Sequence, residues 1–158
     1  MSDSKQQVLA FIDAWNRLDY DAIYAAMTND IFYHNIPMEP CVGIEAVRGF
    51  FEGSGMGSDG AEWIVHHIVA EGDTVLTERT DKFRINGQWI AIRVMGTFEM
   101  RDGKIAKWRD YFDLAEFQNQ LAAAIGGSRV VRHRHVDQAD DGPASDSGTT
   151  TRERGVAP

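Results

Sequence analysis

The sequence predicts a single α+β domain in which a strongly curved, mixed β-sheet packs against helices on one face. The N-terminal part of the chain has apolar residues at helical spacing, whereas residues 63–112 are rich in β-branched and aromatic residues. This second region is divided by Gly72-Asp73, Asn86-Gly87 and Asp102-Gly103, and such dipeptides favour tight hairpin turns. Helices followed by a run of antiparallel strands are typical of an α+β fold, and a sheet that curves over helices encloses a deep, cone-shaped pocket.

Three helices are expected before the strands. The first is predicted by apolar residues at helical spacing, with possible caps at Ser2, Asp3 and Ser4; the apolar residues are Val8, Phe11, Ile12, Trp15 and Leu18. A short second helix is expected to start after Asp21 and to run to about Met27. Residues 31–36 should then be extended, because Pro37 ends them. Residues 44–52 predict a third helix, and a loop rich in Gly and Ser follows at residues 53–60.

Four antiparallel strands are expected next, at residues 63–70, 74–85, 89–100 and 104–112. Gly96 inside the third strand suggests a bulge or a bend. Asp113 should cap a last helix and so complete a domain of residues 1–125. Residues 126–158 contain no aromatic residue and many Gly, Ser, Thr, Arg and Asp residues. This tail cannot bury enough apolar surface to offset the entropy of ordering it, and it is expected to be disordered.

The composition disfavours several classes of protein. No apolar run approaches the roughly 18 residues that a membrane helix needs, and no signal peptide is visible, so a cytoplasmic location is expected. The formal net charge of −8 disfavours nucleic acid as a partner. The single cysteine, Cys41, cannot form an internal disulfide and is expected to be a bystander thiol. The sequence has no phosphate-binding loop, dinucleotide fingerprint or His-Glu metal helix, so neither a cofactor nor a metal is expected.

Two charged residues fall on the apolar face of the strand at residues 74–85. Because side chains alternate along a strand, Arg79 and Asp81 share a face with Val75 and Phe83. Burying a carboxylate costs several kcal/mol unless it is paired or neutralised. For these two residues alone, an internal ion pair that merely holds the sheet together is at least as good an interpretation as a functional site.

A third charged residue changes this balance. In the last strand Asp110 lies between Trp108 and Phe112, on a face that should be buried. One arginine can bind one carboxylate with two hydrogen bonds, but two carboxylates beside Arg79 leave excess negative charge. The simplest resolution is one shared proton, with Arg79 charged, one aspartate ionised and the other neutral. The sequence therefore predicts an acid and a base in one pocket.

Tyr33 and Asn35 add polar groups to the first extended segment. They lie two residues apart, so their side chains share a face and together could hold a water molecule. A core tyrosine beside a turn asparagine is the alternative interpretation. His34 is expected on the opposite face, and at most one of the adjacent His66 and His67 should point inward.

Three segments, in this order, resemble the limonene-1,2-epoxide hydrolase family: Tyr33-His34-Asn35-Ile36-Pro37-Met38, then Arg79-Thr80-Asp81, then Trp108-Arg109-Asp110-Tyr111-Phe112. The resemblance covers roughly residues 5–120. It implies the NTF2-like (SnoaL-like, cystatin-like) cone fold, and the long polar tail departs from the family pattern.

The resemblance also implies a role for each polar residue. Asp81 resembles the general acid that protonates the epoxide oxygen, and Asp110 the general base that deprotonates water. Arg79 resembles the arginine that bridges the two acids, and Tyr33 and Asn35 resemble the residues that hold the water. The family hydrolyses epoxides to vicinal diols in one step, without a covalent ester, metal or cofactor, and its members are commonly homodimers.

The substrate implied by these features is a small lipophilic epoxide. Trp108, Phe112 and Phe83 are candidates for the apolar lining, and ordinary core packing explains them equally well. Two other functions on the same fold stay open at this point. One is an isomerase or cyclase of the ketosteroid-isomerase or polyketide-cyclase kind, and the other is a non-catalytic binding module.

Overall fold

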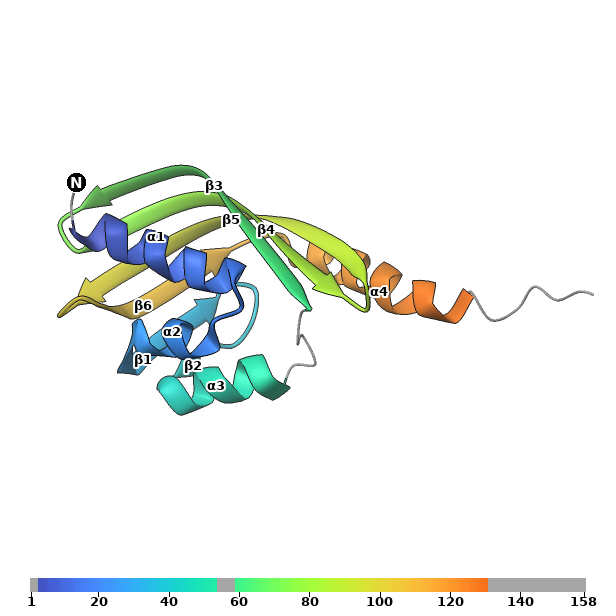
Figure 1. Ribbon diagram of the computed structural model, residues 1–158, viewed down its shortest axis with the longest axis horizontal. Coiled ribbons are helices and arrows are strands. Elements are labelled where there is room, and N and C mark those ends of the chain that lie inside the picture. Colours follow the sequence, from blue (N-terminus) through green and yellow to red (C-terminus); the bar gives the residue numbers. More distant parts are fainter. Residues whose placement is uncertain (1–2, 54–58, 131–158) are drawn as a thin grey trace, which may run out of the picture.

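A computed structural model describes residues 3–53 and 59–130 of the chain (Figure 1). Its six strands form one sheet in the order β2-β1-β6-β5-β4-β3. The strands are β1 (Met27–Asn35), β2 (Cys41–Val42), β3 (Gly60–Glu71), β4 (Thr74–Ile85), β5 (Gln88–Arg101) and β6 (Lys104–Tyr111). The helices are α1 (Asp3–Asn16), α2 (Tyr20–Ala25), α3 (Ile44–Gly53) and α4 (Leu114–Val130). The predicted α+β class is confirmed, with α1 packed along the sheet against β3 and β4 (Figure 1).

The sheet is mixed, as predicted. Strands β3 to β6 form an antiparallel meander, β1 pairs with β6 in parallel, and the short β2 pairs with β1 in antiparallel. The β4–β5 and β5–β6 turns have positive φ at both central residues, which is the type I′ geometry; these are Asn86 (51°) and Gly87 (75°), then Asp102 (52°) and Gly103 (77°). In the β3–β4 turn only Gly72 has positive φ (57°), which matches type II′.

The N-terminal elements differ from the predictions at their ends. Helix α1 ends at Asn16, and Leu18 lies beyond it with a φ of 53°. Helix α2 starts at Tyr20 and not after Asp21, because Asp19 caps it: Asp19 Oδ1 accepts a hydrogen bond from the Ala22 N–H at 3.1 Å. Strand β1 starts at Met27 instead of residue 31. The reason is pairing of Met27 with Ile105 in β6, which no local pattern reveals.

The bulge suggested at Gly96 is not there. Gly96 pairs in register with Thr77 of β4 and with Asp110 of β6, and the irregularity in β5–β6 pairing lies between Glu99 and Met100. Its missing side chain instead leaves room for the Arg79 guanidinium.

Helix α4 is capped at its start and tied to the sheet at its middle. Asp113 caps it as predicted, accepting hydrogen bonds from the N–H groups of Ala115 and Glu116. The Gln120 side-chain amide then bonds to both backbone groups of Ala91 in β5, at 2.8 and 2.7 Å. Ala91 lies outside the part of β5 that pairs with β6, so these two bonds take the place of strand pairing for its backbone groups.

Helix α4 continues to Val130, past residue 125, where the sequence predicts the domain boundary. Glycines in a helix cost about 1 kcal/mol each, yet Gly126 does not end this helix. The rest of the predicted tail, residues 131–158, and residues 54–58 of the predicted loop lie outside the described residues.

The core between α1 and the sheet is largely aromatic. Phe11 of α1 meets Trp108 of β6 edge-on at 5.2 Å, and Trp108 stacks on Phe98 of β5. Trp15 of α1 stacks on Trp63 of β3 at 4.9 Å. No helix within residues 3–53 and 59–130 is both long enough and apolar enough to cross a membrane.

Candidate active site

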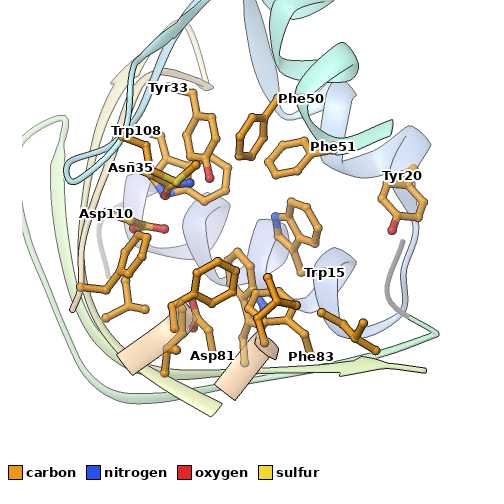
Figure 2. Close-up of a pocket in the computed structure, with 18 residues that line it drawn as sticks. Trp15, Tyr20, Tyr33, Asn35, Phe50, Phe51, Asp81, Phe83, Trp108 and Asp110 are labelled. Atoms are coloured by element: carbon orange, nitrogen blue, oxygen red, sulfur yellow. The ribbon is translucent and has the colours of Figure 1, made fainter. Parts of the chain in front are cut away.

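A cavity of about 240 Å³ lies between the inner face of the sheet and the helices (Figure 2). Most of its lining is aromatic or aliphatic, and its carboxyl and amide groups come from Asn35, Asp81 and Asp110. Figure 2 shows Asp110, Asn35 and the Tyr33 hydroxyl gathered on one side of the cavity, with Asp81 below them. The cavity can therefore hold a small apolar molecule with one reactive polar group.

Strand alternation places the charged residues where the sequence predicts. Arg79 is 1 % exposed, Asp81 2 % and Asp110 4 %, and all three lie on the inner face of the sheet. Arg79 and Asp81 come from β4, and Asp110 comes from β6, with β5 between them. Such burial demands that each charge be compensated by a neighbour.

The Arg79 guanidinium joins the two acids directly. Its Nε donates to Asp81 Oδ1 at 3.0 Å, and its Nη2 donates to Asp81 Oδ2 at 2.9 Å and to Asp110 Oδ2 at 3.0 Å. A further bond, which sequence reasoning missed, runs from Arg79 Nη1 to Thr77 Oγ1 at 2.8 Å. Arg79 thus grips Asp81 with two bonds and Asp110 with one.

Burial raises the pKa of both carboxyls. For Asp81 desolvation outweighs the opposing effect of Arg79 and raises the pKa to about 6. Desolvation also raises the pKa of Asp110, and Arg79 opposes this rise. The Trp108 indole N–H opposes it less, and this group forms no hydrogen bond of normal geometry. Burial alone would lower the pKa of Arg79, but the two carboxylates raise it, so this residue stays charged. One permanent cation beside two carboxyls with raised pKa values favours a state in which the two carboxyls share a single proton.

The parallel pairing of β1 with β6 brings the remaining polar residues to Asp110. Asn35 pairs with Asp110, and Tyr33 pairs with Trp108. Burial raises the pKa of Tyr33 well above its ordinary value, the Asp110 charge raises it further, and a hydrogen bond with Asn35 opposes both effects. Tyr33 therefore remains a hydroxyl that can donate or accept a hydrogen bond beside Asp110.

The histidines lie away from the cavity. His34 points to the other face, as predicted, with its Nε2 2.9 Å from the Met38 carbonyl oxygen. His66 and His67 are both exposed, because a break in the β3–β4 register between Val65 and His67 turns both rings outward. Among the described residues, no group of three or more His, Cys, Asp or Glu side chains is placed to hold a metal ion.

The three predicted apolar lining residues, Phe83, Trp108 and Phe112, all line the cavity. Sequence reasoning missed further lining residues: Trp15, Tyr20, Met38, Phe50, Phe51, Trp63, Ile85, Ile92, Val94, Phe117 and Leu121. Alternation along β4 and β5 could have found Ile85, Ile92 and Val94. The residues from α3 and α4 depend on how these helices pack, which local patterns do not show.

Three kinds of comparison with known proteins agree. Residues 2–123 match the model of the limonene-1,2-epoxide hydrolase catalytic domain. The chain is 36% identical over 123 residues to the epoxide hydrolase EphG of Mycobacterium tuberculosis (strain ATCC 25618 / H37Rv), covering 75% of this chain and 78% of that protein. It is also similar to the structure of an M. tuberculosis LEH-like epoxide hydrolase, with 32% identity, a TM-score of 0.68, and coverage of 82% of this chain and 96% of that one.

More distant structures share the fold alone. TerC, co-crystallised with polyporic acid, is 20% identical with a TM-score of 0.67, covering 76% of this chain and 98% of its own. A putative SnoaL-like polyketide cyclase from Shewanella putrefaciens CN-32 is 17% identical with a TM-score of 0.69, covering 77% of this chain and 98% of its own. Proteins with different names therefore share this fold, and the fold alone does not fix the function.

Proposed function

The chain belongs to the limonene-1,2-epoxide hydrolase family and is an epoxide hydrolase, and we propose that it converts a lipophilic epoxide to a vicinal diol in one step, without a covalent intermediate or a cofactor. The observation that carries this mechanism is the buried cluster in which Arg79 bonds to both Asp81 and Asp110. Two buried acids that share a cation and differ in their other neighbours can divide the roles of general acid and general base.

Asp110 is the general base in this proposal. Its strand neighbour Asn35 and the buried Tyr33 hydroxyl lie on its side of the cavity, not on the side of Asp81. These groups can hold a water molecule by hydrogen bonds while Asp110 takes one of its protons. The resulting hydroxide attacks an epoxide carbon from the side opposite the breaking C–O bond.

Asp81 is the general acid. An epoxide opens slowly at neutral pH because an alkoxide is a poor leaving group, and protonation during ring opening removes this difficulty. A carboxyl with a pKa of about 6 is acidic enough to give up its proton and is neutral in a useful fraction of molecules near neutral pH. The reaction leaves Asp110 protonated and Asp81 ionised, and a proton exchange with solvent restores the starting state.

The lining supports a lipophilic substrate. Phe83, Trp108 and Phe112 form part of a largely apolar wall around the polar groups, and such a wall excludes bulk water and binds hydrocarbon surface. The relatives at 32% and 36% identity are epoxide hydrolases, whereas the cyclase-like structure is at 17%. This difference favours hydrolysis over the isomerase, cyclase and binding-module alternatives.

The test starts with a screen of cyclic and aryl epoxides and chiral analysis of the diols. Single turnover in ¹⁸O-labelled water should then place the label directly in the diol, and Asp110→Asn should nearly abolish diol formation. Asp73→Asn, an exposed aspartate in the β3–β4 turn, is the matched control and should keep full turnover. Label that enters Asp81 or Asp110 before the diol would replace the one-step mechanism by a covalent one. Near-normal turnover of Asp110→Asn would remove the general base from the proposal.

A homodimer is the second part of the proposal. The outer face of the sheet exposes an apolar group formed by Val69, Leu76, Met95 and Tyr111. Val69 pairs with Leu76, and Met95 pairs with Tyr111. The two pairs are offset by two residues along the sheet, because Leu76 lies opposite Thr97 and Met95 opposite Glu78. Exposed apolar patches of this kind mark contact surfaces. Sedimentation should give a dimer for the wild type and a monomer for Met95→Glu, and a wild-type monomer would contradict this part.

A further inference from the structure

Arg79 occupies a close-fitting site beneath the cavity. Its side chain is fully buried, and its guanidinium carbon lies 4.9 Å from the ring centre of Trp63 and 5.7 Å from that of Phe98. Arg79 does not itself line the cavity. It acts on the substrate only through Asp81 and Asp110, so whatever sets the position of its guanidinium sets the geometry of both acids.

Gly96 forms one wall of this site. It is the β5 residue that pairs with Thr77 on one side and with Asp110 on the other. A Cβ atom at Gly96 would overlap Arg79 Nη1 and would lie 2.7 Å from Asp110 Oδ1 and 2.8 Å from Thr77 Oγ1. Real Cβ atoms do not approach other atoms so closely, so any side chain here displaces the guanidinium, the carboxyl or both. The φ angle of Gly96 is not positive, so the need for glycine is a need for space and not for a special backbone conformation.

Thr77, which pairs with Gly96, forms the adjacent wall. Its Oγ1 accepts the hydrogen bond from Arg79 Nη1 at 2.8 Å and donates to the Gly96 carbonyl oxygen at 3.5 Å. Thr77 is 1 % exposed and does not line the cavity. Its hydroxyl therefore has no role in substrate contact, and it satisfies the guanidinium nitrogen that bonds to neither aspartate.

We propose that Gly96 and Thr77 are positioning residues that hold the Arg79 guanidinium where it contacts both Asp81 and Asp110. Gly96 provides the space, and Thr77 provides an acceptor for Arg79 Nη1, the guanidinium nitrogen that bonds to neither aspartate. The inference rests on the proposed function, because the cluster that the two residues position is the proposed acid–base machinery.

The kinetic test uses four variants. Thr77→Val removes the hydroxyl and keeps the shape, Thr77→Ser keeps the hydroxyl, and Gly96→Ala adds one methyl group. Gly49→Ala is the matched control, since a Cβ at this exposed helical glycine meets nothing within 4 Å. The substrate is styrene oxide or cyclohexene oxide, whichever the wild type hydrolyses faster.

Thr77→Val and Gly96→Ala should each lower kcat about tenfold, the factor that corresponds to one misplaced hydrogen bond. KM should change little, because neither residue touches the cavity. Thr77→Ser should recover most of the lost kcat, and Gly49→Ala should match the wild type. The pH profile of kcat should also move to higher pH in Thr77→Val and Gly96→Ala, because Arg79 lowers the pKa of both acids and a displaced guanidinium does so less.

A second measurement does not depend on turnover. Aspartate labelled with ¹³C at its carboxyl carbon reports the titration of the two buried acids in the folded protein, and thermal unfolding checks that each variant folds. The carboxyl midpoints should rise in Thr77→Val and Gly96→Ala and stay unchanged in Gly49→Ala. If the wild type hydrolyses no epoxide, the proposed function fails, and the titration alone decides the positioning role.

Two results would overturn the inference. The first is that folded Thr77→Val and Gly96→Ala keep the kcat, the pH profile and the carboxyl titration of the wild type. The second applies if Gly96→Ala does not fold. In that case the result that overturns the inference is equal kcat and equal carboxyl titration in Thr77→Val and Thr77→Ser.

Discussion

Replacing Asp81 by asparagine should abolish activity and at the same time stabilise the protein near neutral pH. The substitution keeps the shape of the side chain and removes its proton and its charge. Asp81 is 2 % exposed, and burial outweighs Arg79 in setting its pKa. The folded protein therefore prefers a neutral group at this position, even though catalysis needs one that ionises.

The size of the effect follows from the pKa. A rise from 3.8 to about 6, at 1.36 kcal/mol for each unit of pKa, means that ionising Asp81 costs the folded protein about 3 kcal/mol more than it costs the unfolded chain. Because the folded pKa is the higher one, this stability is present below pH 3.8 and is lost as the pH rises through about 6. Asparagine avoids the loss.

One contact works against the variant. An asparagine oxygen can accept from only one of the two Arg79 nitrogens that bond to Asp81, and the other donor is left unsatisfied at a cost of about 1–3 kcal/mol. This cost does not depend on pH. Asp81→Asn should therefore be less stable than the wild type at acid pH, and about 0–2 kcal/mol more stable above neutrality.

Urea unfolding at about pH 4 and about pH 7.5 measures both the gain from removing the buried charge, which depends on pH, and the cost of the lost hydrogen bond, which does not. Between the two conditions, the stability difference should move in favour of Asp81→Asn by about 2–3 kcal/mol. The exposed variant Asp73→Asn should show no such change. A stability deficit of Asp81→Asn that is equal at both pH values would refute the reasoning, because it would mean that burial does not disfavour the Asp81 carboxylate.

Three more substitutions test other parts of the site. Arg79→Met should cost about 3–5 kcal/mol at neutral pH, because it leaves two buried carboxyls without a cation, and less at acid pH, where both are neutral; urea unfolding measures the difference. Tyr33→Phe should lower kcat about tenfold with little change in KM, because it removes one hydrogen bond to the attacking water. Gln120→Ala should lower the free energy of unfolding by about 1–3 kcal/mol, because both backbone groups of Ala91 lose their partner. KM should also rise, because α4 carries Phe117, which lines the cavity, and would be held less firmly.

Two of these substitutions have an exposed counterpart of the same chemistry, and Arg93→Met and Gln118→Ala should each have little effect. A pH-independent loss in Arg79→Met would contradict the charge argument. Unchanged kcat in Tyr33→Phe would remove this hydroxyl from the water site. Wild-type stability and KM in Gln120→Ala would mean that α4 is held by its apolar contacts alone.

The alternation of side chains in β4 and β6 was enough to place Arg79, Asp81 and Asp110 on one inner face. This prediction is possible because period two assigns every residue of a strand to a face, and the turn residues at 86–87 and 102–103 set where each strand begins and ends. The charge conflict of two acids and one arginine followed from the residue types alone, before any distance was known.

The neighbours of these residues depended on tertiary structure. Period two does not say which strands are adjacent, so the parallel pairing that sets Asn35 beside Asp110 was not visible in the sequence. Helical periodicity likewise identifies an apolar face without saying what it covers, so Phe51 and Phe117 were not assigned to the cavity. Alternation also puts Thr77 on the inner face, but no sequence pattern gives it a function, and Gly96 suggests a bulge or a bend rather than a wall of the Arg79 site. What the sequence determined was the face of each strand residue; what the tertiary structure decided was contact between strands, and with it the site that holds Arg79.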